Sequence, residues 1–129
     1  MIYEARPNVT ADAAALCIKT GNAVILRGGK EALASSTAIV KVIRETLAAH
    51  GVCPDAVSLV ESKERESSSL LMGMRGYIDM LIPRGGKGLI KSVVENAKVP
   101  VIETGAGNCH LYVDDSADME MAFHLSYDN

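Results

Sequence analysis

Short runs of β-favouring residues alternate with longer helical runs from one end of the chain to the other. This alternation is typical of βαβ units, because a parallel strand returns to the same edge of a sheet only through a long crossover. We therefore predict an α/β, Rossmann-like fold of three layers, in which a mostly parallel sheet carries helices on both faces. The expected strands are residues 1–5, 23–27, 56–61, 77–82, 99–103 and 110–113, and the expected helices are residues 11–20, 32–50, 67–75 and 87–97.

Three of these segments have especially clear apolar patterns. Residues 23–27 and 77–82 are almost entirely apolar, as expected of central strands whose two faces are both covered by helices. Within residues 32–50, the apolar side chains from Ile39 to Leu47 recur at steps of four, which predicts a helix with one buried face.

The composition is that of a folded, soluble protein, with 48% hydrophobic and 22% charged residues. No linker or internal repeat interrupts the sequence, so we predict one domain over residues 1–129. The 13 basic and 16 acidic residues give a net charge of −3, which argues against a nucleic-acid partner. No apolar run approaches the roughly 20 residues that cross a bilayer, and the first residues lack the order of a signal peptide. We therefore expect no membrane partner and a cytoplasmic location.

The three cysteines are Cys17, Cys53 and Cys109, and they form no C-x-x-C motif. Their wide spacing predicts neither a disulfide framework nor a zinc site. We expect ordinary thiols in or near the core, and we assign no metal.

Three predicted strands run into glycine-rich segments, at residues 28–30, 83–88 and 104–107. At the carboxyl ends of parallel strands, backbone N–H groups and helix dipoles together favour anions. Paired cations flank the first two segments and are Arg27 with Lys30 and Arg84 with Lys87. Turn geometry alone also requires glycine, so a purely structural role stays open, but the cations favour an anionic cofactor.

Two standard nucleotide-binding motifs are missing from the sequence. The phosphate-binding loop G-x-x-x-x-G-K-[ST] needs a glycine before Lys-Ser, whereas Lys91 and Ser92 follow Ile90. The fingerprint G-x-G-x-x-G does not follow the first predicted strand, because residues 6–10 contain no glycine. A dinucleotide would therefore have to bind in a non-standard way.

Four segments carry a family resemblance. They are IYEARPNVT at residues 2–10, KTGNAVILRGGK at 19–30, YIDMLIPRGG at 77–86 and VIETGAGNCHLYVD at 101–114. In order and spacing they closely resemble the γ-glutamyl phosphate reductase family, also called glutamate-5-semialdehyde dehydrogenases, of the aldehyde dehydrogenase superfamily. The resemblance implies an enzyme that uses NADPH to reduce a small-molecule substrate, γ-glutamyl phosphate, to glutamate-5-semialdehyde in proline biosynthesis.

The resemblance also assigns one turn to the adenosine ribose of the cofactor. This turn contains Arg27, Gly28, Gly29 and Lys30. An acidic residue at such a position favours a free 2′-hydroxyl, whereas two cations complement a 2′-phosphate through charge-assisted hydrogen bonds. We therefore predict NADP rather than NAD.

The remaining site residues are assigned by the same resemblance. Gly85 and Gly86 would present their backbone amides to the pyrophosphate, assisted by Arg84. Glu103 falls where aldehyde dehydrogenases carry a water-activating glutamate. Phosphate, not water, takes part in the reductase reaction, so the alternatives for Glu103 are a cofactor-side role and a structural carboxylate. Asn8 resembles the amide donor that stabilises the oxyanion of a thiohemiacetal.

The catalytic cysteine of the family lies in an Arg-Pro-Ser-x-Cys-Asn segment that this sequence does not contain. None of the three cysteines present occupies its position. We therefore expect the chain to carry the cofactor-binding part of the enzyme and to be inactive alone. The alternatives are a non-catalytic dinucleotide-binding module and an inactive fragment, and formation of a homo-oligomer is left open.

Overall fold

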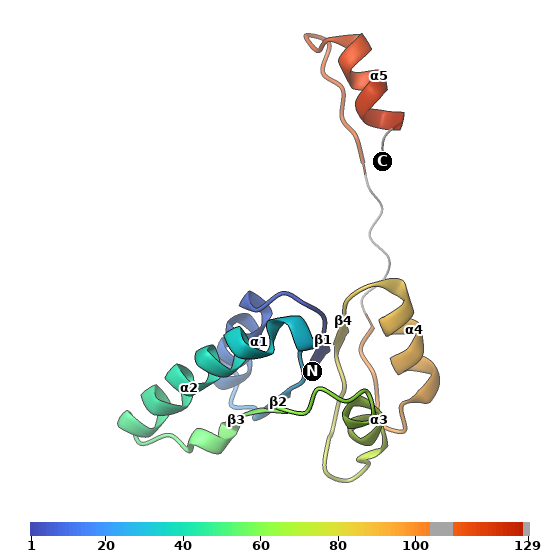
Figure 1. The fold of residues 1–129 in the computed structure, drawn as a ribbon. Coiled ribbons are helices and arrows are strands. Elements are labelled where there is room, and N and C mark those ends of the chain that lie inside the picture. Colours follow the sequence, from blue (N-terminus) through green and yellow to red (C-terminus); the bar gives the residue numbers. More distant parts are fainter. Residues whose placement is uncertain (104–109, 128–129) are drawn as a thin grey trace.

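The computed structural model describes residues 1–103 and 110–127, and its strands run parallel (Figure 1). The strands are β1 (Ile2–Tyr3), β2 (Val24–Leu26), β3 (Val57–Leu59) and β4 (Pro83–Arg84). β1 pairs with β4, and β2 pairs with β3. A parallel bridge between Ile2 and Arg27 connects the two pairs, so the order across the sheet is β3-β2-β1-β4.

Backbone hydrogen bonds make these pairs one layer. The Tyr3 N–H donates to the Arg27 carbonyl at 2.9 Å, and the Leu81 N–H donates to the Pro100 carbonyl at 2.8 Å, beside a parallel bridge between Leu81 and Val101. The predicted α/β class is thus confirmed. From β1 the chain builds β2 and β3 on one side and then crosses to β4 on the other side. A topological switch point therefore lies beside β1, where open α/β sheets bind their ligands.

The helices follow the predicted positions within a few residues, with one addition. They are α1 (Asn8–Lys19), α2 (Leu33–Ala49), α3 (Glu66–Gly73), α4 (Lys87–Asn96) and α5 (Met119–Tyr127), with short 3-10 turns η1 (Lys30–Ala32) and η2 (Pro54–Ala56). Gly21 and Gly51 lie just beyond α1 and α2 with φ of 74° and 71°. These left-handed conformations end the two helices. The sequence patterns did not predict α5.

Two hydrophobic cores lie on opposite faces of the sheet, since neighbouring side chains of a strand point to opposite sides. Tyr3 belongs to the first core, which α1 and α2 cover, and Ile2 belongs to the second, which α3 and α4 cover (Figure 1). The buried residues of the first core are Tyr3, Val9, Ala13, Ala14, Val24, Leu26, Val40, Leu47 and Val57, and those of the second are Ile2, Leu71, Met72, Leu81, Val93 and Val99. This arrangement confirms the three-layer prediction.

The strand prediction for residues 77–82 is wrong in its first part. Gly76 adopts φ 88°, and the next residues form a turn in which the Tyr77 side chain is 85% exposed. Apart from a local bridge between Arg75 and Ile78, strand pairing begins at Leu81 and continues into β4. The strand predicted at residues 110–113 pairs with no other strand within the described part of the chain.

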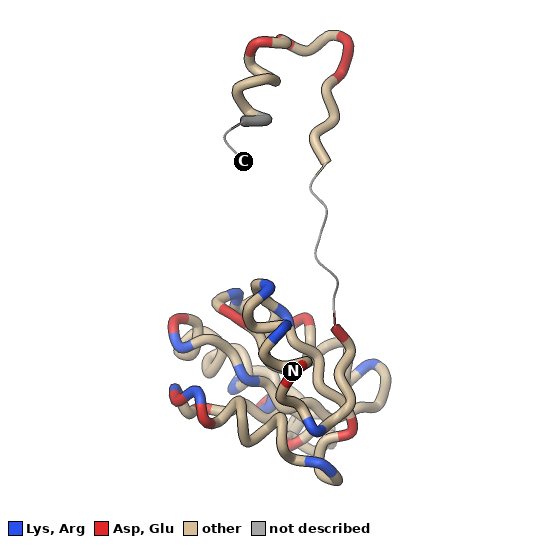
Figure 2. The backbone as a smooth tube through the Cα atoms, turned by 90° about the vertical axis from the view of Figure 1, so that its right-hand side faces the viewer, with Lys and Arg blue, Asp and Glu red and all other residues tan. Residues whose placement is uncertain are grey.

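Residues 110–127, which include α5, lie away from the sheet and its helices (Figures 1 and 2). This segment has four acidic residues and no Lys or Arg, and its large apolar side chains are mostly exposed. None of the described helices is both long enough and apolar enough to cross a membrane.

Candidate cofactor-binding site

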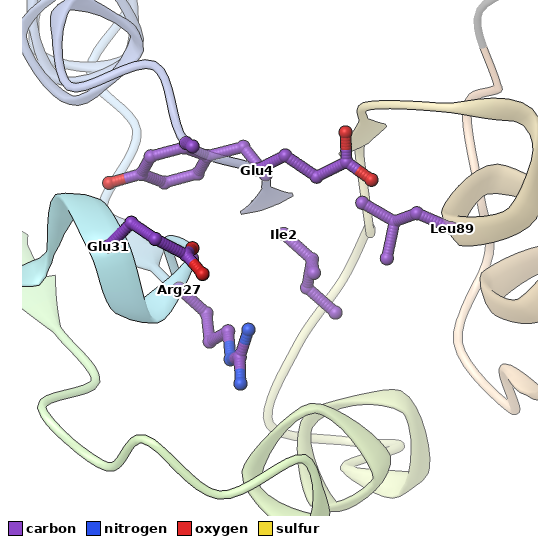
Figure 3. Close-up of a pocket in the computed structure, with 8 residues that line it drawn as sticks. Ile2, Glu4, Arg27, Glu31 and Leu89 are labelled. Carbon is purple, nitrogen blue, oxygen red and sulfur yellow. The ribbon is translucent and has the colours of Figure 1, made fainter.

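A cleft of about 360 Å³ opens at the carboxyl end of β1 (Figure 3). Its lining residues are Ile2, Tyr3, Glu4, Ala5, Arg27, Gly29, Glu31 and Leu89. The cleft lies at the switch point of the sheet, and its volume falls in the range of about 300–1,000 Å³ that small-molecule sites occupy. Of the predicted cofactor-binding residues, Arg27 and Gly29 line it directly.

The first glycine-rich turn (residues 27–30) is built onto the core. A Cβ atom at Gly28 would lie 3.1 Å from the Tyr3 ring, so the backbone passes closer to the ring than a side chain allows. Tyr3 cannot easily yield, because it is 2% exposed and its hydroxyl shares a hydrogen bond of 2.7 Å with Thr10. Thr10 in turn donates to the Ser36 hydroxyl at 3.0 Å. Gly28 therefore has a packing role in this structure.

The two cations of the first turn lie in different surroundings. The Arg27 Nη2 atom donates to the Glu64 carbonyl at 3.2 Å, and Figure 3 shows the guanidinium pointing away from Glu4. Lys30 is exposed at the start of η1 and does not line the cleft, whereas the next residue, Glu31, does. The turn thus brings a carboxylate to the wall of the cleft.

The second glycine-rich turn (residues 84–87) leads directly into α4. Gly86 is the N-cap residue, and its N–H donates to the Glu4 Oε2 atom at 3.0 Å. A Cβ atom at Gly85 would lie 2.6 Å from the Glu4 Cδ atom, so Glu4 fits only because residue 85 is glycine. Arg84 and Lys87 are exposed and form no ion pair within the described residues.

Glu4 is a site residue that the sequence reasoning missed. It follows β1 directly and lines the cleft, and its carboxylate points toward α4 (Figure 3). An acidic side chain at the carboxyl end of a predicted strand was the available signal. Sequence patterns of anion-binding sites consist of glycines and cations, so a carboxylate does not fit them.

The predicted oxyanion donor Asn8 and the predicted cofactor-side residue Glu103 do not line the cleft. Asn8 begins α1, and its Nδ2 atom donates to Asp12 at 3.4 Å on the surface. Glu103 is exposed beyond the bridge at Val101. Cys109 and the third glycine-rich segment, residues 104–107, lie outside the described residues.

Two further features of the described residues carry none of the predicted site residues. A second hollow, of about 550 Å³, lies between α2 and β3 and is lined by Thr37, Val40, Lys41, Arg44, Glu45, Ser58, Leu59 and Glu61. Cys17 packs against the first core, and Cys53 is exposed. No three His, Cys, Asp or Glu side chains gather to hold a metal ion in the described part of the chain.

The sequence matches the aldehyde dehydrogenase family over residues 6–127. Among curated proteins, it is 65% identical to the γ-glutamyl phosphate reductase of Lacticaseibacillus casei over 122 residues, which are 95% of this chain and 29% of that protein. It is 59% identical to the γ-glutamyl phosphate reductase of Carboxydothermus hydrogenoformans over the same share of both chains. The chain therefore spans about 29% of the length of these relatives.

Solved structures of related enzymes are also similar to this chain. The crystal structure of γ-glutamyl phosphate reductase from Thermotoga maritima superimposes with a TM-score of 0.81 at 48% identity, over 94% of this chain and 29% of that one. An engineered glycolyl-CoA reductase with bound NADP+ superimposes with a TM-score of 0.70 at 29% identity, over 94% of this chain and 28% of that one.

Proposed function

Because this chain belongs to the aldehyde dehydrogenase family, we propose that it supplies the NADP-binding part of a γ-glutamyl phosphate reductase. The whole enzyme would reduce γ-glutamyl phosphate to glutamate-5-semialdehyde in proline biosynthesis, with NADPH supplying the hydride. The main support is the 65% identity to a curated reductase over 95% of the chain. In this proposal the cytoplasm is the location, and formation of a homo-oligomer stays a prediction.

The residues present fit a dinucleotide at the cleft. The Gly86 N–H already holds an anionic oxygen, that of Glu4, at 3.0 Å, so a carboxylate stands where a phosphate oxygen would bind. The positive end of the α4 dipole favours either anion. We assign the pyrophosphate to the amides of Gly85 and Gly86 with Arg84 nearby, and the adenosine ribose to the turn that follows β2.

We assign NADP rather than NAD on the charge of one residue of that ribose-binding turn, Lys30. Lys30 is next to Gly29, which lines the cleft, and it takes part in no ion pair among the described residues. A lysine has the reach and the charge to meet a 2′-phosphate. The neighbouring structure with bound NADP+ supports the same choice.

A titration of the chain with NADPH and NADH, followed by cofactor fluorescence, tests the assignment of the site. We expect NADPH to bind more tightly, and NADPH at about 100 times its Kd should stabilise the fold by about 2.7 kcal/mol. Lys30→Glu should remove or reverse the preference for NADPH. Lys19→Glu makes the same charge change in the last turn of α1, and it should leave the preference intact.

The reductase reaction itself needs the rest of the enzyme. We therefore suggest exchanging this chain for the matching segment of the Lacticaseibacillus casei relative, which it matches at 65% identity. The hybrid should reduce γ-glutamyl phosphate with NADPH at a rate within about tenfold of that relative. A hybrid that folds and binds NADPH without turning over would favour the non-catalytic dinucleotide-binding module instead. A chain that is folded but binds no cofactor would favour the inactive fragment.

A further inference from the structure

Glu4 occupies the backbone amide that the proposed function gives to the pyrophosphate. Its Oε2 atom accepts the hydrogen bond of the Gly86 N–H at 3.0 Å, and Figure 3 shows its carboxylate directed toward the start of α4. A carboxylate and a phosphate oxygen are both anionic acceptors favoured by the positive end of a helix dipole. Two anions cannot share this position without strong mutual repulsion.

We propose that Glu4 is an autoinhibitory residue of the cofactor site. In the free protein its carboxylate fills the anion position at the start of α4, and it leaves when the pyrophosphate of a dinucleotide binds. This inference rests on the proposed function, because it concerns the same cleft. Since the bond between Glu4 and Gly86 must break first, Glu4 lowers the affinity for the cofactor.

The surroundings of Glu4 allow such an exchange. Glu4 is exposed, so its carboxylate can turn into the solvent and be hydrated there. Its present position depends on the missing side chain of Gly85, where a Cβ atom would lie 2.6 Å from the Glu4 Cδ atom. The contact is thus a shape-dependent fit between the end of β1 and the turn before α4.

Glu31 provides a matched comparison, because it is the second carboxylate that lines the cleft. It approaches the other turn, where a Cβ atom at Gly29 would lie 3.4 Å from the Glu31 Oε2 atom. Removing the charge of Glu31 changes the net charge of the cleft by the same amount as removing that of Glu4. It leaves the Gly86 N–H occupied, so the two variants separate occupation of the amide from general repulsion.

The test measures two affinities for the full 129-residue chain. Cofactor fluorescence gives the Kd for NADPH, and calorimetry gives the Kd for inorganic pyrophosphate. The proteins are the wild type, Glu4→Gln, Glu4→Ala and Glu31→Gln, each first shown by urea unfolding to be folded. We expect both Glu4 variants to bind both probes about fivefold to tenfold more tightly, and Glu31→Gln to gain about twofold at most.

The outcomes separate this inference from the proposed function. If the wild type binds NADPH and neither Glu4 variant binds it more tightly than Glu31→Gln does, the inference is overturned while the cofactor site stands. If no protein binds NADPH but the Glu4 variants bind pyrophosphate more tightly than the wild type, the cofactor assignment fails and the competition at α4 is supported. Unchanged binding of both probes overturns the inference.

Discussion

The two glycine-rich turns at the carboxyl edge of the sheet have similar compositions but different roles in the structure. Each combines two glycines with two cations. The first turn is fixed to the core through Gly28, which lies against the Tyr3 ring, and to the segment before α3 through the bond from Arg27 to Glu64. The second turn stays at the surface, where its amide holds the Glu4 carboxylate. A pattern of glycines and cations thus identifies a turn that suits an anion. It does not show whether the backbone amides and cations of that turn are free to bind one.

The difference arises from what surrounds each turn. β1 lies between them and supplies a buried aromatic ring to the first, and the residue after β1 supplies an exposed carboxylate to the second. Helix length does not separate the turns, because the first leads through η1 directly into α2, which has 17 residues, and the second leads into α4, which has 10. The contacts that each turn makes therefore decide which of them offers a backbone amide to an anion.

The largest difference between the turns should appear when a side chain is added to each. Gly28→Val would press against the Tyr3 ring, and overpacking of this kind costs about 3 kcal/mol of unfolding free energy. Gly86→Val should cost about 1 kcal/mol or less, because a Cβ atom there would lie 3.7 Å from the nearest atom, on Glu4. Urea unfolding of both variants measures the contrast. Equal losses would show that packing does not distinguish the turns.

The hydroxyl of Tyr3 should contribute the next largest effect. Tyr3→Phe breaks the buried bond of 2.7 Å to Thr10, and the loss of such a bond costs about 1 to 2 kcal/mol. Tyr77→Phe is the control, since that side chain is 85% exposed, and it should change the unfolding free energy by less than about 0.5 kcal/mol. A similar loss in both variants would remove the reason for treating Tyr3 as a fixed support under the first turn.

Much of the fold could be predicted because it follows from local patterns. The apolar residues from Ile39 to Leu47 predicted α2, and the apolar run before Arg27 predicted β2. The run at residues 77–82 misled, because an apolar sequence does not reveal that Gly76 turns the chain and leaves Tyr77 exposed. Local composition sets propensity, whereas tertiary contacts decide which residues pair.

The candidate site was predictable only in part, for a related reason. The glycines at both turns could be found, because strand ends in a parallel sheet require them. The residues that form hydrogen bonds with these turns could not be predicted. Glu4 and Gly86 are separated by 82 positions, and Arg27 and Glu64 by 37. Such contacts depend on the order of strands across the sheet, which no short pattern determines.

The cations of the two turns should differ in a smaller but measurable way. Arg27→Gln removes a bond to the Glu64 carbonyl and should lower the unfolding free energy by about 1 kcal/mol. Arg84→Gln should leave it within about 0.5 kcal/mol, because Arg84 is exposed and unpaired among the described residues. If the Arg84 variant is the less stable one, the second turn is fixed by its cation after all, and the comparison is reversed.

The smallest effect should come from Gly88, inside the first turn of α4. Nothing lies within 4 Å of a Cβ atom built there, and its φ is not positive. Gly88→Ala should therefore stabilise the protein by about 0.5 kcal/mol, because alanine has the higher helix propensity and loses less backbone entropy on folding. Gly28→Ala is the matched change in the glycine-rich turn at residues 27–30, where the added Cβ atom would lie 3.1 Å from the Tyr3 ring. If urea unfolding shows a loss of stability for Gly28→Ala and a gain for Gly88→Ala, the glycine-rich turn at residues 27–30 requires its glycine, whereas α4 does not require Gly88. A loss of stability in both variants would show that the start of α4 also requires a glycine.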